Sequence, residues 1–225
     1  MQVFYTEADI EACLTDAFLN RYRSYRLKDV ALTGILLARP EDKITKEAIL
    51  PHLEFWHYRS DYYTDFFCAG YVPTQFVSDA KPVGVQIAGL DWGFSMRAFV
   101  ELVENMERQT GWRYNGDPCL LLANAYFDGT KAHLDCARSI TINFREALED
   151  KAISTPTQLA DSVFEFAKYV NENTTDPVWE LSDKFGRKLI KRGLKDAFLA
   201  WLPSWLSPSA KAGFHFVVHE VRAGA

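Results

Sequence analysis

The sequence has few cysteines and no long apolar run. Cys13, Cys68, Cys119 and Cys136 form no CxxC pair and show no zinc-ligand spacing. No stretch approaches the roughly 18 uninterrupted apolar residues typical of a membrane span. The first residues carry no basic segment followed by an apolar one, so no secretory signal is expected. These absences exclude a disulfide scaffold and predict a cytoplasmic protein without cofactor or metal.

Sequence motifs for nucleotides and for common hydrolases are missing as well. There is no GxGxxG, no GxxxxGK[ST] and no Gly-x-Ser-x-Gly. The formal net charge of −5 gives no overall signature of nucleic-acid binding. The chain has 225 residues, 48% of them hydrophobic and 24% charged, which is typical of a globular protein that can bury a large core.

The pattern of apolar residues predicts an α/β protein. We expect helices over 7–24, 45–60 (kinked at Pro51), 95–110, from Thr155 to about 172, and 177–203. Strands are expected over 29–38, 64–71 and 119–127, with the chain from Lys131 returning antiparallel after the Asp128-Gly129 turn. Residues 72–94 are interpreted as irregular with a short strand at 83–88, and the tail 214–221 as strand-like.

Two short motifs and this element order resemble the thioredoxin superfamily. Ala48-Ile49-Leu50-Pro51-His52-Leu53 is similar to the segment in which a proline kinks the first core helix of that family. Asp117-Pro118-Cys119 and the later Asp128-Gly129 are similar to its cis-proline, following strand and hairpin turn. The resemblance covers about residues 29–172 and implies a mixed four-stranded sheet flanked by helices.

The same resemblance implies that thiol chemistry is absent. If Pro51 matches the family's helix proline, the two redox cysteines would fall at Lys43 and Lys46. Thiol–disulfide exchange needs a thiolate and a second thiol to resolve the mixed disulfide, and lysine supplies neither. We therefore expect a redox-silent core that is not a thiol–disulfide oxidoreductase.

The resemblance also marks a candidate ligand groove. In the family, the residue before the cis-proline offers its backbone to a peptide or thiol ligand, which makes Lys43, Lys46, Asp117 and Pro118 the candidates here. The alternative is that Asp117-Pro118 only begins a strand, as X-Pro pairs often do. An enzyme of another class that uses this groove, with Lys43, Lys46 or a histidine as acid–base groups, also stays open.

The remaining cysteines and histidines favour structural roles. Cys119 and Cys136 lie on the two arms of the predicted hairpin and would face each other in one register, but burial as small apolar residues is favoured. His215 and His219, four apart, do not complete a zinc site, because a tetrahedral site needs further ligands.

Positive charge is concentrated near the C-terminus, in what we call the basic segment (residues 184–195). Six of its twelve residues are basic, and without them the chain has 19 lysines and arginines against 30 acidic residues. A basic amphipathic helix followed by tryptophans can bind an acidic partner, a membrane surface or nucleic acid, or it can simply pack on the core. The candidate partner-binding residues are Lys184, Arg187, Lys188, Lys191, Arg192, Lys195, Trp201 and Trp205.

From these features we expect an N-terminal helix (1–28), an α/β core (29–172) and a C-terminal helical extension (173–225). The favoured function is a non-catalytic protein-binding or assembly module that meets a protein partner or a second copy of itself. The alternatives are the acid–base enzyme described above and a peripheral membrane or nucleic-acid binder acting through residues 184–206.

Overall fold

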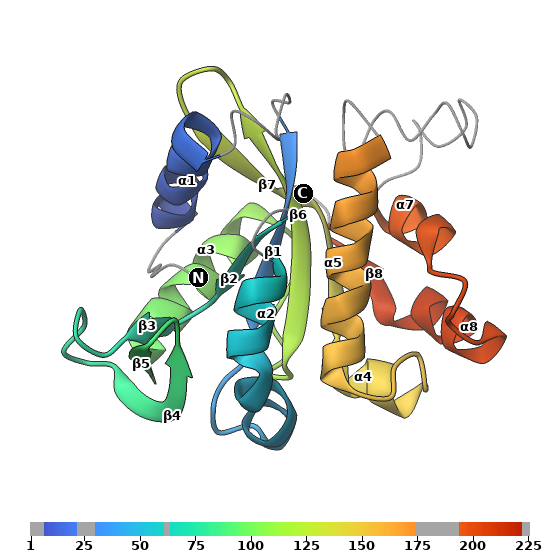
Figure 1. Ribbon diagram of the computed structural model, residues 1–225, viewed down its shortest axis with the longest axis horizontal. Helices are drawn as coiled ribbons and strands as arrows, with labels where there is room; N and C mark the ends of the chain where they lie inside the picture. Colours follow the sequence, from blue (N-terminus) through green and yellow to red (C-terminus); the bar gives the residue numbers. More distant parts are fainter. Residues whose placement is uncertain (1–6, 22–29, 61–63, 174–193, 222–225) are drawn as a thin grey trace.

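Two β-sheets and the helices around them make up the computed structural model, which describes residues 7–21, 30–60, 64–173 and 194–221 (Figure 1). The larger sheet has the order β2-β1-β6-β7-β8, and the smaller one the order β3-β5-β4. The strands are β1 (Val30–Leu37), β2 (Asp65–Cys68), β3 (Tyr71–Pro73), β4 (Lys81–Ile87), β5 (Leu90–Phe94), β6 (Cys119–Phe127), β7 (Ala132–Asn143) and β8 (Val218–Glu220). The protein is therefore α/β, as predicted, with one mixed sheet and one antiparallel sheet.

The apolar strands β1 and β6 occupy the middle of the larger sheet. β1 runs parallel to β2, with Thr33 opposite Asp65, and antiparallel to β6, with Leu37 opposite Cys119. Both faces of β1 and β6 are covered, which explains why their sequences are almost continuously apolar. The parallel pair requires a crossover, and the helical segment from Thr45 to Ser60 supplies it.

Helices cover both faces of the larger sheet. In Figure 1, α2 (Leu53–Ser60) and α5 (Pro156–Asn173) lie side by side in front of the sheet, and α3 (Met96–Gln109) crosses behind it. α7 (Leu194–Trp201) and α8 (Pro208–Val217) pack beyond α5, and α8 lies next to α4 (Phe144–Glu149). None of the described helices is both long and apolar enough to cross a lipid bilayer.

The helix signals in the sequence are largely confirmed. The Ser95 side chain accepts a hydrogen bond from the amide of Ala98 at 3.3 Å and so caps α3. The segment predicted to kink at Pro51 consists of a π-helical turn (η2, Thr45–Ile49), a 3-10 turn that contains Pro51 (η3, Leu50–His52), and then α2. Proline cannot donate the helical hydrogen bond, which accounts for the change of helix type at this point.

The smaller sheet corrects the prediction for residues 64–94. The strand expected over 64–71 ends at Cys68, because Gly70 adopts a φ of 76° and turns the chain into β3. The strand expected at 83–88 is confirmed as β4, which begins at Lys81, but the region also contains β5, joined to β4 by a turn in which Ala88 and Gly89 both have positive φ. Alanine rarely adopts a positive φ, so the Ala88-Gly89 pair is not recognisable as a turn from the sequence.

The C-terminal prediction is wrong for residues 214–217. They belong to α8, whose first turn carries Pro208 and whose cap is the Ser207 side chain, which accepts from the amide of Ala210 at 3.1 Å. Only Val218–Glu220 form a strand, and this fifth strand pairs with β7. The predicted helix over 177–203 is described only from Leu194 onward, and its earlier part lies outside the described residues.

Among the described residues no strand pairs with the outer side of the first half of β7, and α1 (Glu7–Asp16) covers that edge. The Thr15 hydroxyl accepts a hydrogen bond from the amide of Ala132 at 2.8 Å, and the Glu11 carboxylate accepts from the amide of Leu134 at 3.2 Å. Side chains thus satisfy edge amides that another strand would otherwise pair with. The predicted first helix continues as the π-helical turn η1 (Ala17–Arg21).

Candidate functional site

The predicted groove residues lie at one end of the larger sheet, where β1 ends and β6 begins. Asp117 and Pro118 lead into β6, and Lys43 and Lys46 lie just before and within the first helical turn after β1. Both lysines are exposed, and neither forms an ion pair with any residue that the structure describes. The structure therefore brings the predicted segments to the same end of the larger sheet, but neither lysine forms an ion pair with Asp117.

The Asp117–Pro118 peptide bond is trans, since no described residue follows a cis bond. This corrects the cis bond implied by the resemblance. The Pro118 carbonyl accepts a hydrogen bond from the amide of Phe144 at 2.9 Å, so the Pro118 backbone is tied to the start of α4. A ligand backbone would have to compete with this contact.

Arg145 joins the two carboxylates at this edge. Its Nη2 lies 2.7 Å from Asp42 Oδ2, and its Nε lies 2.7 Å from Asp117 Oδ1. The side chains of Asp42, Asp117 and Arg145 are 14%, 29% and 39% exposed. A planar guanidinium offers several donors in a fixed arrangement, and this explains why one arginine can hold two carboxylates. We call this group the Asp42–Arg145–Asp117 bridge.

Further hydrogen bonds saturate both acids. Asp117 Oδ2 accepts from the amide groups of Asn143 at 3.3 Å and Asn115 at 3.2 Å. Asp42 Oδ1 accepts from the amide of Thr45 at 3.0 Å and so begins the helical segment after β1. The bridge therefore connects the ends of β1, β6 and β7.

The environment of Asp117 lowers the pKa of its carboxyl group. Partial burial alone would raise that pKa, but the hydrogen bonds from Arg145 and Asn143 and the charge of Arg145 outweigh it. A general base works best with a pKa near the working pH and with a lone pair directed at substrate. The pKa of Asp117 is lowered instead, so its environment favours a structural role over acid–base catalysis.

A groove of about 310 Å³ opens beside this bridge, between α3 and the loop before Asp117. Apolar side chains of α3 line it, among them Phe99, Val100 and Val103, together with Tyr114 and Arg39. The Tyr114 hydroxyl donates to the carbonyl of Gly116 at 3.1 Å and holds the loop in place. Within the described part of the chain, no carboxylate forms an ion pair with Arg39. The groove thus combines an apolar wall with two exposed side chains of opposite charge, Arg39 and Glu104.

The four cysteines are all free thiols and do not form a redox pair. Cys119 lies opposite Asn143, whereas Cys136 follows Asp135, which lies opposite Asn124, so the two thiols are separated along the hairpin and do not face each other. Burial raises the pKa of the Cys68 and Cys119 thiols. A neutral, buried thiol is a poor nucleophile.

The histidines do not gather into a metal site. His215 is exposed on α8, and His219 lies in β8, where its Nε2 is 2.9 Å from a carboxylate oxygen of Glu146. In the described ranges, no three histidine, cysteine or acidic side chains come together in a way that could hold a metal ion.

Most of the basic segment lies outside the described residues, namely Lys184, Arg187, Lys188, Lys191 and Arg192. Lys195 is half-buried on α7. Trp201 packs in an aromatic cluster, with ring centroids 5.3 Å from Phe166 and 6.3 Å from Phe198. Trp205 is 56% exposed, so it is the tryptophan of this pair that offers most of its surface to solvent.

Sequence reasoning missed Arg145, Asn143 and Arg39. Asn143 caps α4, accepting from the amides of Arg145 and Glu146, and an asparagine at the end of an apolar strand with a glutamate three residues later is a recognisable cap signal. The partners of Arg145 leave no such signal, because Asp42 and Asp117 lie 103 and 28 residues away.

Comparison with known proteins gives no further assignment: no protein-family model, no curated protein and no solved structure matches the chain.

Proposed function

We propose that the chain is a non-catalytic protein-binding module built on a redox-silent thioredoxin-like core. The Asp42–Arg145–Asp117 bridge carries this proposal. It lies at the end of the larger sheet that corresponds to the active-site end of thioredoxin-like enzymes. At that place it has two carboxylates held by one arginine instead of reactive groups. The Cys119 thiol beside the bridge is buried and has a raised pKa, and Arg145 holds both carboxylates, which disfavours thiol exchange and proton transfer by these groups.

The strand arrangement supports the thioredoxin-like part of the proposal. β2-β1-β6-β7 contains one parallel pair joined through a helix and one antiparallel hairpin, which is the arrangement that the resemblance implies. The trans bond before Pro118, the additional β8 and the smaller sheet are departures from the family pattern.

Two surfaces are proposed to meet partners. The first is the groove beside Arg39, whose apolar wall suits an apolar segment and whose Arg39 and Glu104 can meet a charge of either sign on it. The second is the basic segment with Trp205, which suits an acidic protein surface. The second surface depends on the sequence alone for its charge.

The test compares three variants of the full chain. A variant with all four cysteines changed to alanine should keep the partners captured by wild type, and wild type should not accelerate disulfide reduction in the presence of a dithiol. Changing Lys188 and Lys191 to glutamate should weaken partner capture, whereas the exposed Lys151→Glu should leave it unchanged. Disulfide reductase activity that is present in wild type and lost in the variant without cysteines would refute the proposal. Partner capture by the Lys188→Glu, Lys191→Glu variant equal to that of wild type would refute it as well.

A further inference from the structure

A second groove, of about 500 Å³, lies between β4 and the start of α2. One wall is formed by Gly84, Val85 and Gln86 of β4, and the opposite wall by Leu50, Pro51 and Glu54. Three consecutive strand residues line it, although neighbouring side chains of a strand point to opposite faces. The groove therefore follows the backbone edge of β4.

That edge carries unpaired main-chain groups. The Asp91 carbonyl accepts a hydrogen bond from the amide of Thr74 at 2.9 Å, so the Asp91 backbone faces away from β4. Gln86 lies directly opposite Asp91, and in an antiparallel ladder such a pair does not exchange hydrogen bonds. The Gln86 amide and carbonyl consequently point away from β5, and β4 has no other strand neighbour among the described residues.

Only the second half of β4 lacks the features that block pairing at a sheet edge. Its first half carries Lys81 and Pro82 and a bulge between Pro82 and Val85, in which Gly84 has a φ of 71°. Charge, proline and bulges are the features that prevent unwanted pairing at sheet edges. They are absent from Val85 to Ile87, which is the part of β4 that borders the groove.

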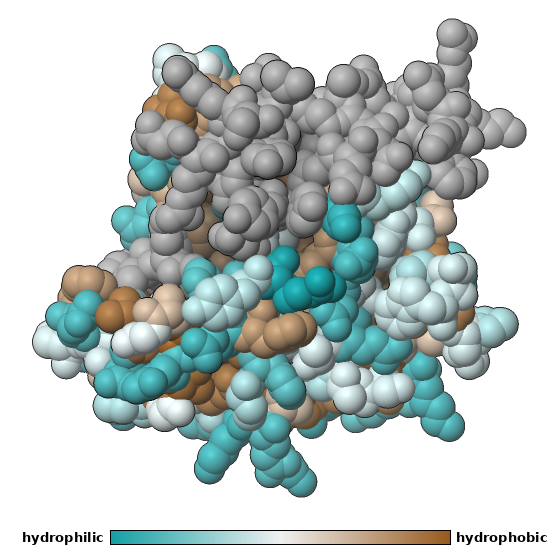
Figure 2. Space-filling view, in the orientation of Figure 1, coloured by the Kyte–Doolittle hydropathy of each residue, from teal (hydrophilic) through white to brown (hydrophobic). Residues whose placement is uncertain are grey.

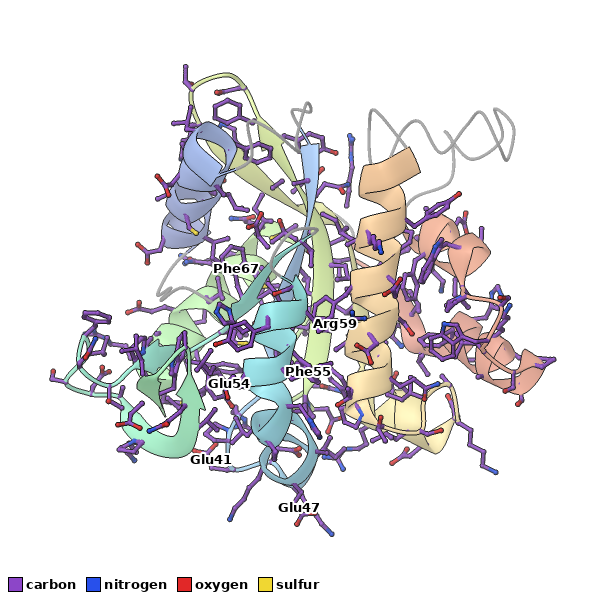
Figure 3. All side chains as sticks on the ribbon, viewed as in Figure 1. Glu41, Glu47, Glu54, Phe55, Arg59 and Phe67 are labelled. Carbon is purple, nitrogen blue, oxygen red and sulfur yellow. The ribbon has the colours of Figure 1, made fainter. Side chains whose placement is uncertain are left out.

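The charge of the groove indicates what it would bind. Glu54 and Asp91 both line it, and neither forms an ion pair with a cation in the described ranges. Figure 3 shows Glu54 on the side of α2 that faces β4. In Figure 2 the surface over β4 and the start of α2 is mainly hydrophilic, with apolar residues visible between the two. A basic side chain would find two carboxylates here, and an apolar one would find Leu50 and Pro51.

We propose that this groove binds an extended peptide segment with a basic side chain, which pairs with the main chain of Gln86 and becomes a fourth strand of the smaller sheet. A strand edge beside a helix is a known way of holding extended peptides, in which main-chain bonds give affinity and alternate side chains give specificity. The proposal names a partner class for the binding module proposed above, but it depends on neither the bridge nor the thiols.

The probe is a short capped peptide in which arginine alternates with threonine and valine, titrated into the full chain and followed by NMR. Binding should shift the amide signals of Val85 to Ile87 and slow hydrogen exchange at Gln86. Glu54→Gln and Asp91→Asn should each weaken binding about fivefold, in line with a partly exposed ion pair. Glu101→Gln, an exposed acid on α3 that does not line the groove, is the matched control and should leave binding unchanged.

A change in the peptide alone tests the strand pairing. Methylating the backbone nitrogen that meets Gln86 leaves the charge intact but removes a donor, and should weaken binding about tenfold. Gln86→Pro should have the same effect from the protein side, because the main-chain amide it removes is not bonded to β5; Gln86→Ala, which removes only the side-chain hydrogen bond to Asp91 at 2.9 Å, should keep the strand pairing. Equal binding of the methylated peptide, or of a peptide with glutamate in place of arginine, would overturn the proposal. Neither result would show thiol or acid–base chemistry, so failure of the peptide groove would leave the non-catalytic binding function proposed above intact.

Discussion

Removing the Arg145 guanidinium should destabilise the fold. Arg145→Gln leaves the carboxylates of Asp42 and Asp117 without their shared cation, although both are mostly enclosed. Each of the two contacts is a charge-assisted hydrogen bond of 2.7 Å, which is worth roughly 1.5–3 kcal/mol when fully buried. Because the Arg145 side chain is 39% exposed, solvent screening reduces each contact to about 1 kcal/mol. We expect the free energy of unfolding to fall by about 2 kcal/mol at neutral pH.

Urea unfolding followed by tryptophan fluorescence measures this loss as a lower midpoint at unchanged slope. Arg97→Gln is the matched control, because the Arg97 side chain is 69% exposed and lies 3.9 Å from Asp79, so its loss should cost below about 0.5 kcal/mol. A double-mutant cycle with Asp117→Asn should return a coupling of about 1 kcal/mol between Arg145 and Asp117.

The effect should also depend on pH in one direction. The pKa of Asp117 is lowered in the folded protein, so its stabilising contribution is complete above the unfolded-state pKa of about 3.9 and is lost as the pH falls through the lower folded-state value. The difference between wild type and Arg145→Gln should therefore shrink below about pH 4. If Arg145→Gln is as stable as Arg97→Gln at neutral pH, a structural role for the bridge is refuted, and the result would favour a reactive site.

Two packing predictions follow from the helices. A Cβ added at Gly213 would lie 2.9 Å from the backbone of Ala152, so Gly213→Ala should lower the free energy of unfolding by about 1–3 kcal/mol in thermal or urea unfolding. Gly111→Ala is the control, because its added Cβ meets nothing within 4 Å, and it should change stability by less than about 0.5 kcal/mol. Equal losses in the two variants would contradict the contact between Gly213 and Ala152. Thr15→Val removes the acceptor of the Ala132 amide and should cost about 1–2 kcal/mol, with faster hydrogen exchange at that amide; an amide that stays protected would show that α1 does not seal the edge.

The strands and helices with strong local signals could be predicted from the sequence. β6 was predicted with its observed bounds, because a leucine-rich run between Asp117-Pro118 and Asp128-Gly129 has clear limits at both ends. The cap at Ser95 and the change of helix type around Pro51 also depend on neighbouring residues alone. Local chemistry of this kind needs no knowledge of the tertiary structure.

The smaller sheet and the bridge depend on long-range contacts. A strand at 83–88 was predicted, but β5 carries Asp91 and Gly93, which weaken a strand signal, and its pairing with β4 is set by an Ala88-Gly89 turn without a recognisable sequence. Asp117 was predicted to share a ligand groove with Lys43 and Lys46; its actual partner Arg145 was not predicted, because only the hairpin geometry brings the two side chains together. Asp117 was therefore singled out from the sequence, but the residue that determines its chemistry, Arg145, was missed.

The chain enters and leaves the smaller sheet at almost the same point. Tyr71 and Phe94 lie opposite each other, and the amide of Ser95 donates to the carbonyl of Gly70 at 2.8 Å. Residues 71–94 therefore form an inset whose ends meet, and changes in its length or sequence need not disturb the order of strands in the larger sheet. One wall of the groove at β4 belongs to this inset and the other to the core helix α2. Such an arrangement lets evolution, or an engineer, exchange the inset while the scaffold that supports it is kept.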